Sequence, residues 1–440
     1  MLNVLLFFLT YAGGILQAFR VAPVYAFLVY QAVYFYNPSM RWWHYLIPEI
    51  SYSFYVVALM GLLYILNRKQ LDRNKISVVP QLKYFVLLIL LHSIVYFWAV
   101  YPIAHSIFTE VFIKLGITML IAYKLINTIK HLDYAIVGYI YGAWYLSFVA
   151  YQVGRNSGNR VEGIGTVDTP DANGTASVLV PAIVFCVYYI WVTKGLLKKG
   201  IFLVAAAFIA NALVLINSRG AFLGAAIGLT YFMGTLFFTS VKNKSQKLKV
   251  FAVGIVGLIA ALSVMDDSFK ERIFSIVEES EVDTSRESGS TRTIFWVSAV
   301  KMSFDYPLGQ GIKGFNYHAP DYIPQDVVVS SSGDNSRASR RKSVHSTWFE
   351  VLSELGYLGV ILFLGVIITS FKSISAVKKK LRPLGHRAAE HYYKMVSIES
   401  ALIGFMVTMS FINRMRSEVF YWCILFSACA YNLYVVRKQK

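Results

Sequence analysis

The chain has 440 residues, of which 56% are hydrophobic and only 15% are charged, and its formal net charge is +18. Soluble domains carry roughly 25% charged residues, so this composition excludes an ordinary soluble protein. The positive charge does not require a nucleic-acid partner, because lysine and arginine are in excess in the cytoplasmic loops of membrane proteins.

Apolar runs long enough to cross a membrane recur from one end of the chain to the other. A spanning helix needs roughly 17–25 apolar residues, and these runs are continuous rather than alternating, which excludes a membrane β-barrel. We predict an all-α polytopic membrane protein with roughly 12–13 transmembrane helices. The expected spans are residues 2–18, 21–36, 49–66, 83–101, 107–125, 132–152, 174–193, 200–217, 219–239, 248–264, 346–371, 394–412 and 417–436.

The ends of these runs define the organisation of the chain. The first two runs are near the lower length limit and fit either two thin helices or one helix and a re-entrant segment. The N-terminus lacks the basic segment and cleavage site of a signal peptide, so we expect a retained helix there. We predict N-terminal helices in residues 1–264, a large polar loop in 265–345 and C-terminal helices in 346–440, all within one membrane domain.

The distribution of basic residues predicts the orientation. Clusters of lysine and arginine occur in loops that all fall on one side of the predicted membrane, which is therefore expected to be cytoplasmic. These clusters lie at residues 68–75, 194–199, 242–249, 378–387 and 437–440. The long polar loop then lies on the opposite side of the membrane.

Several arginines nevertheless occur on that opposite side, where the rule predicts few basic residues. A bound anion is one explanation, and snorkelling to lipid phosphates is the other. The arginines concerned are Arg155, Arg160, Arg219, Arg292, Arg414 and Arg416.

Arg219 is the most informative of them, because almost no loop separates the two apolar runs on either side. It is expected at the N-terminus of a helix, where unpaired N–H groups and the helix dipole favour an anion. Gly220, Gly224 and Gly228 follow at four-residue spacing, a pattern that permits close packing of another helix. We expect this packing to fix the helix end that carries the arginine.

The second half of the long loop has helical periodicity. From Thr291 to Met302 the apolar residues recur at the spacing of an amphipathic helix at the membrane surface, with Arg292 in its first turn. Residues 307–315 then form a glycine-rich turn that could present backbone N–H groups to a phosphate.

His345 stands at the mouth of the next membrane helix, directly after the polar loop. A titratable ring at this boundary suits proton transfer on a lipid-borne substrate, and the alternative is that it only caps or anchors the helix. Glu350 and Glu354 follow within two turns and could orient it, although packing against neighbouring helices is the alternative for both.

A metal site is not expected. Asp266 and Asp267 form a carboxylate pair that could suggest one, and we interpret them as solvated residues after a helix end. The three cysteines are expected to be small packing residues rather than disulfide or metal ligands, since all lie within apolar runs: Cys186, Cys423 and Cys429.

Three segments together resemble the signature of the bacterial O-antigen ligase and O-antigen polymerase superfamily. They are Thr291-Arg292-Thr293-Ile294-Phe295-Trp296, Pro307-Leu308-Gly309-Gln310-Gly311, and His345-Ser346-Thr347-Trp348-Phe349-Glu350 followed by Leu355-Gly356-Tyr357-Leu358-Gly359. Asn217-Ser218-Arg219-Gly220 is similar to the family's other arginine motif. Tyr36-Asn37-Pro38, after two thin helices, resembles the exosortase-associated O-glycosylation ligases.

The resemblance implies a membrane-embedded glycosyltransferase of the GT-C type in the bacterial inner membrane, without a metal or other cofactor and with its active site facing the periplasm. The implied donor is a glycan on undecaprenyl pyrophosphate, and the implied acceptor is a sugar hydroxyl on lipid A–core or a similar molecule. Arg219 and Arg292 match the family's pyrophosphate positions, His345 matches its catalytic histidine, and Arg160 is a looser match to another arginine. Arg414 and Arg416 are assigned to pyrophosphate binding from topology alone.

Direct attack by the acceptor would invert the anomeric centre. A polymerase or a protein O-oligosaccharyltransferase of the same superfamily is the alternative activity. A transporter of polyisoprenoid-linked glycans is the alternative from a different class, but transporters place ionisable residues at mid-membrane, whereas this chain gathers them at one face.

Overall fold

The computed structural model describes residues 1–169, 171–239, 245–265, 289–324 and 336–437. Within these residues the chain is almost entirely helical, and strand-type pairing is limited to an isolated bridge between Ser157 and Arg160. The predicted all-α polytopic fold is therefore confirmed. Asp266 and Asp267, considered above as metal ligands, lie outside the described residues.

The helices follow one another with short connections. The α-helices are α1 (Leu2–Arg20), α2 (Val24–Tyr36), α3 (Tyr52–Leu66), α4 (Arg68–Leu71), α5 (Pro80–Val95), α6 (Pro102–Leu125), α7 (Ile129–Val153), α8 (Ala172–Ser177), α9 (Val180–Val192), α10 (Leu196–Ile216), α11 (Arg219–Phe238), α12 (Gln246–Val264), α14 (Gly289–Asp305), α15 (Gly314–Tyr322), α16 (Thr347–Leu381), α17 (Ala389–Met409) and α18 (Glu418–Tyr431). Shorter helical turns are η1 (Pro38–Met40), η2 (His44–Leu46), η3 (Ile76–Val78), η4 (Tyr96–Trp98), η5 (Arg382–Ala388) and η6 (Asn432–Val436).

Eight segments of the described chain are long and apolar enough to cross a membrane. This is fewer than the roughly 12–13 spans predicted, partly because α2 and α3 have 13 and 15 residues and are shorter than the ~20 that a straight crossing needs. In addition, α16 and α17 fall within a single apolar segment, Thr347–Met409, because η5 joins them without a loop. Almost every residue of α2 is buried, so protein rather than lipid surrounds this short helix.

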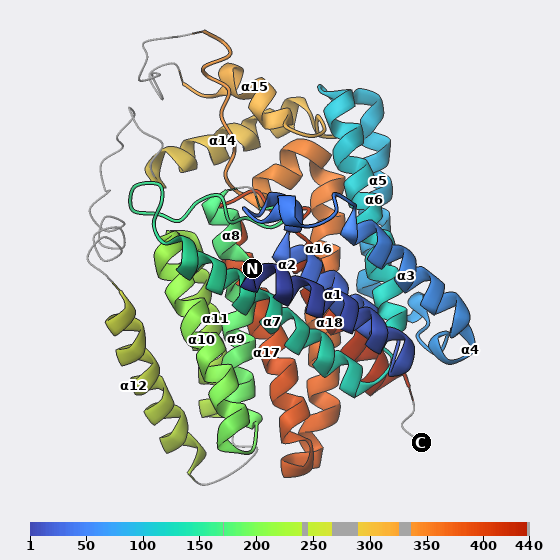
Figure 1. The fold of residues 1–440 in the computed structure, drawn as a ribbon. Helices are drawn as coiled ribbons and strands as arrows, with labels where there is room; N and C mark the ends of the chain where they lie inside the picture. The colour runs from blue at the N-terminus through green and yellow to red at the C-terminus, as the bar shows by residue number, and fades with distance from the viewer. Residues whose placement is uncertain (170, 240–244, 266–288, 325–335, 438–440) are drawn as a thin grey trace.

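The two ends of the bundle differ in composition. In Figure 1 the basic connections before α5, after α9 and between α16 and α17 lie toward the lower end, where the C-terminus also lies. Helices α14 and α15 cover the upper end, together with the loops that follow α2 and α7. The candidate site residues are at this upper end.

The glycine stripe on α11 packs against α17, as its spacing predicted. A Cβ added to Gly224 would lie 2.5 Å from the backbone oxygen of Gly404, and one added to Gly228 would lie 3.0 Å from the oxygen of Ser400. Gly220 similarly lies against the Phe411 side chain, at 3.2 Å. Close packing along this whole face fixes the start of α11, and with it Arg219, against the end of α17.

Helix α16 is broken at Gly356, which has the left-handed backbone angle φ = 64°. The break frees the N–H of Tyr357 to donate to the carbonyl of Pro307 over 3.0 Å. A Cβ at position 356 would lie only 2.1 Å from that same oxygen, so glycine is required here both for its backbone angle and for space. The short first part of α16, which carries Glu350 and Glu354, is thereby joined to the turn that follows α14.

Candidate active site

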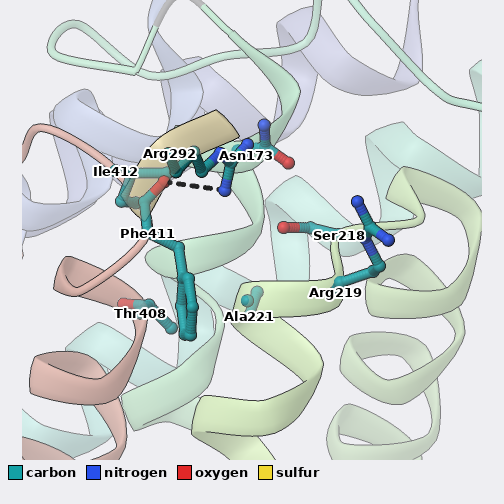
Figure 2. A pocket seen from close by; sticks show the side chains of 9 residues that line it. Asn173, Ser218, Arg219, Ala221, Arg292, Thr408, Phe411 and Ile412 are labelled. Carbon is teal, nitrogen blue, oxygen red and sulfur yellow. Dashed lines mark hydrogen bonds between the residues drawn. The ribbon is translucent and has the colours of Figure 1, made fainter. Parts of the chain in front are cut away.

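A polar hollow at the upper end of the bundle brings together two of the predicted arginines. Arg219, the first residue of α11, and Arg292, in the first turns of α14, both line it (Figure 2). The remaining walls come from α8, from the last turn of α17 and from the residues just after it. The lining residues are Asn173, Ser218, Arg219, Gly220, Ala221, Arg292, Thr408, Phe411 and Ile412.

The local chain conformation explains how Arg219 is placed. Asn217 ends α10 in the left-handed conformation, and Ser218 is the extended residue that precedes α11. The chain therefore reverses within two residues, and Arg219 becomes the first residue of the new helix. Its guanidinium adds a full positive charge to the partial charge of the helix N-terminus, which suits a phosphate group.

Arg292 reaches the same hollow from a segment far away in the sequence. Its Nη1 donates to the carbonyl of Phe411 over 3.4 Å, a contact that holds the side chain at the edge of the hollow (Figure 2). Phe411 also packs on Gly220, so one residue contacts the helix of Arg219 and the side chain of Arg292.

Arg160 lies behind this site rather than within the lining. It donates from Nη2 to the side-chain oxygen of Asn173 over 2.7 Å and from Nε to the carbonyl of Ile216 over 3.2 Å. Asn173 lines the hollow, so Arg160 adds positive charge next to the site and holds one of its walls.

His345 has an unusual backbone conformation for a residue with a side chain, with φ = 47°. Left-handed angles cost a non-glycine residue roughly 1–2 kcal/mol, so its neighbours must hold it in place. On one side, the indole of Trp296 donates to the carbonyl of Val344 over 3.1 Å. On the other, the N–H of Ser346 donates to the side-chain oxygen of Asn413 over 2.9 Å.

The turn after α17 connects this histidine segment to the arginine hollow. Thr347 donates from its hydroxyl to the carbonyl of Ile412 over 2.7 Å and accepts the N–H of Arg414 over 2.8 Å. Ile412 lines the hollow, although His345 itself does not. The structure thus brings Arg219, Arg292 and the His345 segment to one turn, residues 410–414, from three different parts of the chain.

Arg416, in contrast, is surrounded by carboxylates. Its guanidinium contacts Glu354 over 2.7 Å and Glu350 over 3.0 Å, and all three side chains are largely buried. Burial acts to lower the pKa of Arg416, but Glu354 and Glu350 outweigh it and the pKa is raised. The charge of this arginine is already balanced within the protein.

Arg414 has a similar environment. It is buried, donates to the backbone oxygen of Asp168 and to the hydroxyl of Ser417, and lies 3.4 Å from the Asp168 carboxylate. Burial again acts to lower its pKa, and the Asp168 charge more than offsets it. Neither Arg414 nor Arg416 lines the hollow, so we leave both out of the donor site proposed below.

Glu350 belongs to the same buried network. One carboxylate oxygen contacts Arg416, and the other accepts the N–H of Met415 over 3.2 Å. Both oxygens therefore hold the turn after α17, and these contacts favour packing over the alternative in which Glu350 orients His345.

The expectation that the glycine-rich turn offers its N–H groups to phosphate is wrong. The N–H groups of Gln310 and Gly311 donate to the carbonyls of Ser353 and Glu354, each over 2.9 Å. Those of Ile312 and Lys313 donate to His105 Nδ1 and to the Glu354 carboxylate. The turn at residues 307–315 is thus hydrogen-bonded to the kinked start of α16 and holds it in place.

Two neutral histidines, His92 and His105, extend this hydrogen-bond network. Because His105 Nδ1 accepts a backbone N–H, its Nε2 carries the proton and donates to the carbonyl of His92 over 2.7 Å. The hydroxyl hydrogen of Thr109 is donated to the carbonyl of His105, so the Thr109 oxygen must accept the hydrogen bond from His92 Nδ1. His92 Nε2 is then unprotonated and accepts from Arg416 over 3.5 Å. This network was not predicted, because its members come from α5, α6, α16 and the turn after α17.

The described residues contain no group of three or more histidine, cysteine, aspartate or glutamate side chains placed to hold a metal ion. Fold and site together define a polytopic membrane protein with an arginine-rich hollow at the end of the bundle opposite its basic loops. A family model described as O-Antigen ligase matches residues 202–364, from α10 into α16, and covers the arginines of the hollow and His345. The match supports the resemblance to the O-antigen ligase and polymerase superfamily that the motifs carry. No curated protein matches it.

Proposed function

We propose that the protein is an inverting glycosyltransferase that moves a glycan from undecaprenyl pyrophosphate to a sugar hydroxyl on lipid A–core or a similar acceptor. The observation that carries this proposal is the convergence of Arg219, Arg292 and a helix N-terminus on one hollow. Anions of the pyrophosphate type are bound in this way, by guanidinium forks and backbone N–H groups.

The arginines supply the part of the chemistry that concerns the leaving group. When the bond between the anomeric carbon and the phosphate oxygen breaks, undecaprenyl pyrophosphate leaves with an additional negative charge. Arg219 begins a helix that packs closely on α17, and Arg292 contacts the turn after α17, so both can stabilise that charge with little rearrangement. They bind the donor in the ground state and bind it more tightly as the bond breaks.

His345 supplies the part that concerns the acceptor. The acceptor hydroxyl oxygen attacks the anomeric carbon from the side opposite the pyrophosphate, and its proton passes to the imidazole as the new glycosidic bond forms. An imidazole is suited to this role because its ordinary pKa is near neutral pH. The left-handed backbone at His345 is held between the contacts of Trp296 and Asn413 with its neighbours, and this restraint on the main chain supports a defined role for the residue.

The basic loops gather at the lower end of the bundle (Figure 1), which supports a cytoplasmic lower end and a periplasmic site in the bacterial inner membrane. A polymerase or a protein O-oligosaccharyltransferase would use the same donor chemistry and differs in the acceptor. The neutralised state of Arg414 and Arg416 weighs against a transporter, because both buried cations hold the fold together at the site end rather than lining a pathway at mid-membrane.

One assay distinguishes these activities. Purified protein is given an undecaprenyl-pyrophosphate-linked glycan together with rough-type lipopolysaccharide, which ends at the core sugars, and the products are separated by size. One transfer per acceptor indicates a ligase, whereas donor-on-donor ladders indicate a polymerase. Wild-type protein that binds the donor but transfers glycan neither to the lipopolysaccharide nor to a second donor molecule would refute the proposal.

A further inference from the structure

A second cavity lies at the upper end of the bundle, between the loop after α2 and the loop after α7. It is open to the outside, its volume of about 490 Å³ is within the range of small-molecule binding sites, and it shares no lining residue with the arginine hollow. Its lining residues are Ser39, Met40, Arg41, Trp42, His44, Val153, Asn156, Glu162, Gly163 and Ile164.

The floor of this cavity is rigid. Arg41 is only 2% exposed and donates to three carbonyls, those of Phe35, Tyr36 and Ile164, over 2.8–2.9 Å. The first two carbonyls belong to the last turn of α2, so the guanidinium caps that helix while joining the two loops. Asn37 adds a further bond from its side-chain amide to the carbonyl of Gly165.

The walls present two kinds of group. Trp42 is 51% exposed, so much of its ring is available to a ligand. Asn156 and Glu162 clamp each other through reciprocal bonds of 2.8 and 3.0 Å, which use the backbone of Glu162 and the side chain of Asn156. The Glu162 side chain is therefore not needed for the clamp, and it makes no ion pair within the described residues.

A cavity lined by both an exposed aromatic ring and an available carboxylate suits a sugar. The C–H face of a pyranose packs on an aromatic ring, and a carboxylate accepts hydrogen bonds from neighbouring hydroxyls. The loop after α2 also exposes the apolar side chains of Met40, Leu46 and Ile50, which suit a ligand anchored in lipid.

One loop connects this cavity with the donor hollow. Glu162 lines the cavity, and Arg160, two residues earlier, bonds to the hollow-lining Asn173. Between them, the N–H of Val161 donates to the carbonyl of Leu215 in the last turn of α10, two residues before Asn217. Since a transfer enzyme needs donor and acceptor sites on one rigid frame, we propose that the cavity is the acceptor subsite and binds a sugar of the acceptor glycolipid. This inference rests on the proposed function.

The test uses full-length protein in detergent with two substitutions, Glu162→Gln and Trp42→Leu. The probe is delipidated core oligosaccharide carrying a fluorescent label, and its binding is measured by fluorescence anisotropy. Loss of a hydrogen bond to a charged group predicts about tenfold weaker binding for Glu162→Gln, and we expect a several-fold loss for Trp42→Leu. The matched controls are Glu49→Gln and Tyr45→Leu, two exposed residues of the same loop that do not line the cavity.

Transfer kinetics provide the second readout. Glu162→Gln should raise the KM for rough-type lipopolysaccharide by about the same factor, while the KM for the donor and the kcat at saturating acceptor stay near the wild-type values. Wild-type transfer with no change in oligosaccharide binding or acceptor KM in either variant would overturn the acceptor subsite and leave the proposed function standing. Wild-type protein that binds the oligosaccharide at this cavity but transfers nothing would refute the transferase activity, and the cavity would then be a sugar-binding site but not an acceptor subsite.

Discussion

The contact between α11 and α17 makes a prediction that the structure allows to be worked in detail. In Gly224→Ala, the added Cβ would lie 2.5 Å from the backbone oxygen of Gly404 and 2.6 Å from the methyl group of Thr408. An ordinary C···O contact is about 3.3–3.6 Å, so the helices must separate by up to about 1 Å. A backbone oxygen cannot rotate away as a side chain can.

The expected magnitude combines two opposing effects. Overpacking of this kind costs roughly 1–3 kcal/mol, and the higher helix propensity of alanine returns at most about 1 kcal/mol. The control is Gly234→Ala on the same helix, where an added Cβ meets nothing within 4 Å and only the gain in propensity applies. The two variants should therefore differ in unfolding free energy by roughly 1–3 kcal/mol.

The assay is the thermal unfolding midpoint of both variants in the same detergent. Gly224→Ala should unfold at a temperature lower by a few degrees, and Gly234→Ala at or above the wild-type midpoint. Because Gly224 packs one turn after Arg219, Gly224→Ala should also weaken donor binding. Equal midpoints for the two alanine variants would refute the close packing that places Arg219.

Three further outcomes are expected from the site. His345→Ala should lower turnover by roughly 10²–10⁴-fold in initial-rate assays while donor binding stays near wild type, and an unchanged rate would exclude it as the base. Arg416→Ala should destabilise the fold by roughly 3–5 kcal/mol, because Glu350 and Glu354 would be left buried without a counter-charge. Adding Glu350→Gln and Glu354→Gln to this variant should restore much of the thermal unfolding midpoint. A midpoint that does not recover would contradict the charge balance between Arg416 and the two glutamates. Transfer activity should survive EDTA, whereas inhibition that magnesium or manganese reverses would indicate a metal.

Much of the architecture could be predicted from the sequence, because membrane spans and packing glycines leave local signals. The apolar runs gave the fold class, and the spacing of Gly220, Gly224 and Gly228 indicated the packing face of α11. The position of Arg219 followed from the lack of a loop before it. The predicted span at residues 21–36 coincides with α2, but the sequence did not show that this short helix is surrounded by protein instead of lipid.

The pairing of distant side chains could not be predicted in this way. Arg414 and Arg416 broke the charge rule as clearly as Arg219 did, yet their counter-charges lie at Asp168, Glu350 and Glu354, 62 to 246 residues away along the chain. Nothing local in the sequence distinguishes an arginine whose charge is balanced by a buried carboxylate from one that lines a hollow. The prediction for the glycine-rich turn was wrong for the same reason, since the groups that accept hydrogen bonds from its N–H groups lie on α16 and α6.

The most direct test of the central account is donor binding by three arginine variants. Undecaprenyl pyrophosphate binding is measured for Arg219→Ala, Arg292→Ala and Arg337→Ala, where Arg337 is an exposed control outside the hollow that pairs with Asp321. Loss of a charge-assisted hydrogen bond predicts roughly 10–100-fold weaker binding for each of the first two variants and an unchanged affinity for the third. Wild-type affinity in both Arg219→Ala and Arg292→Ala, or an equal loss in all three variants, would contradict the assignment of the hollow as the pyrophosphate site.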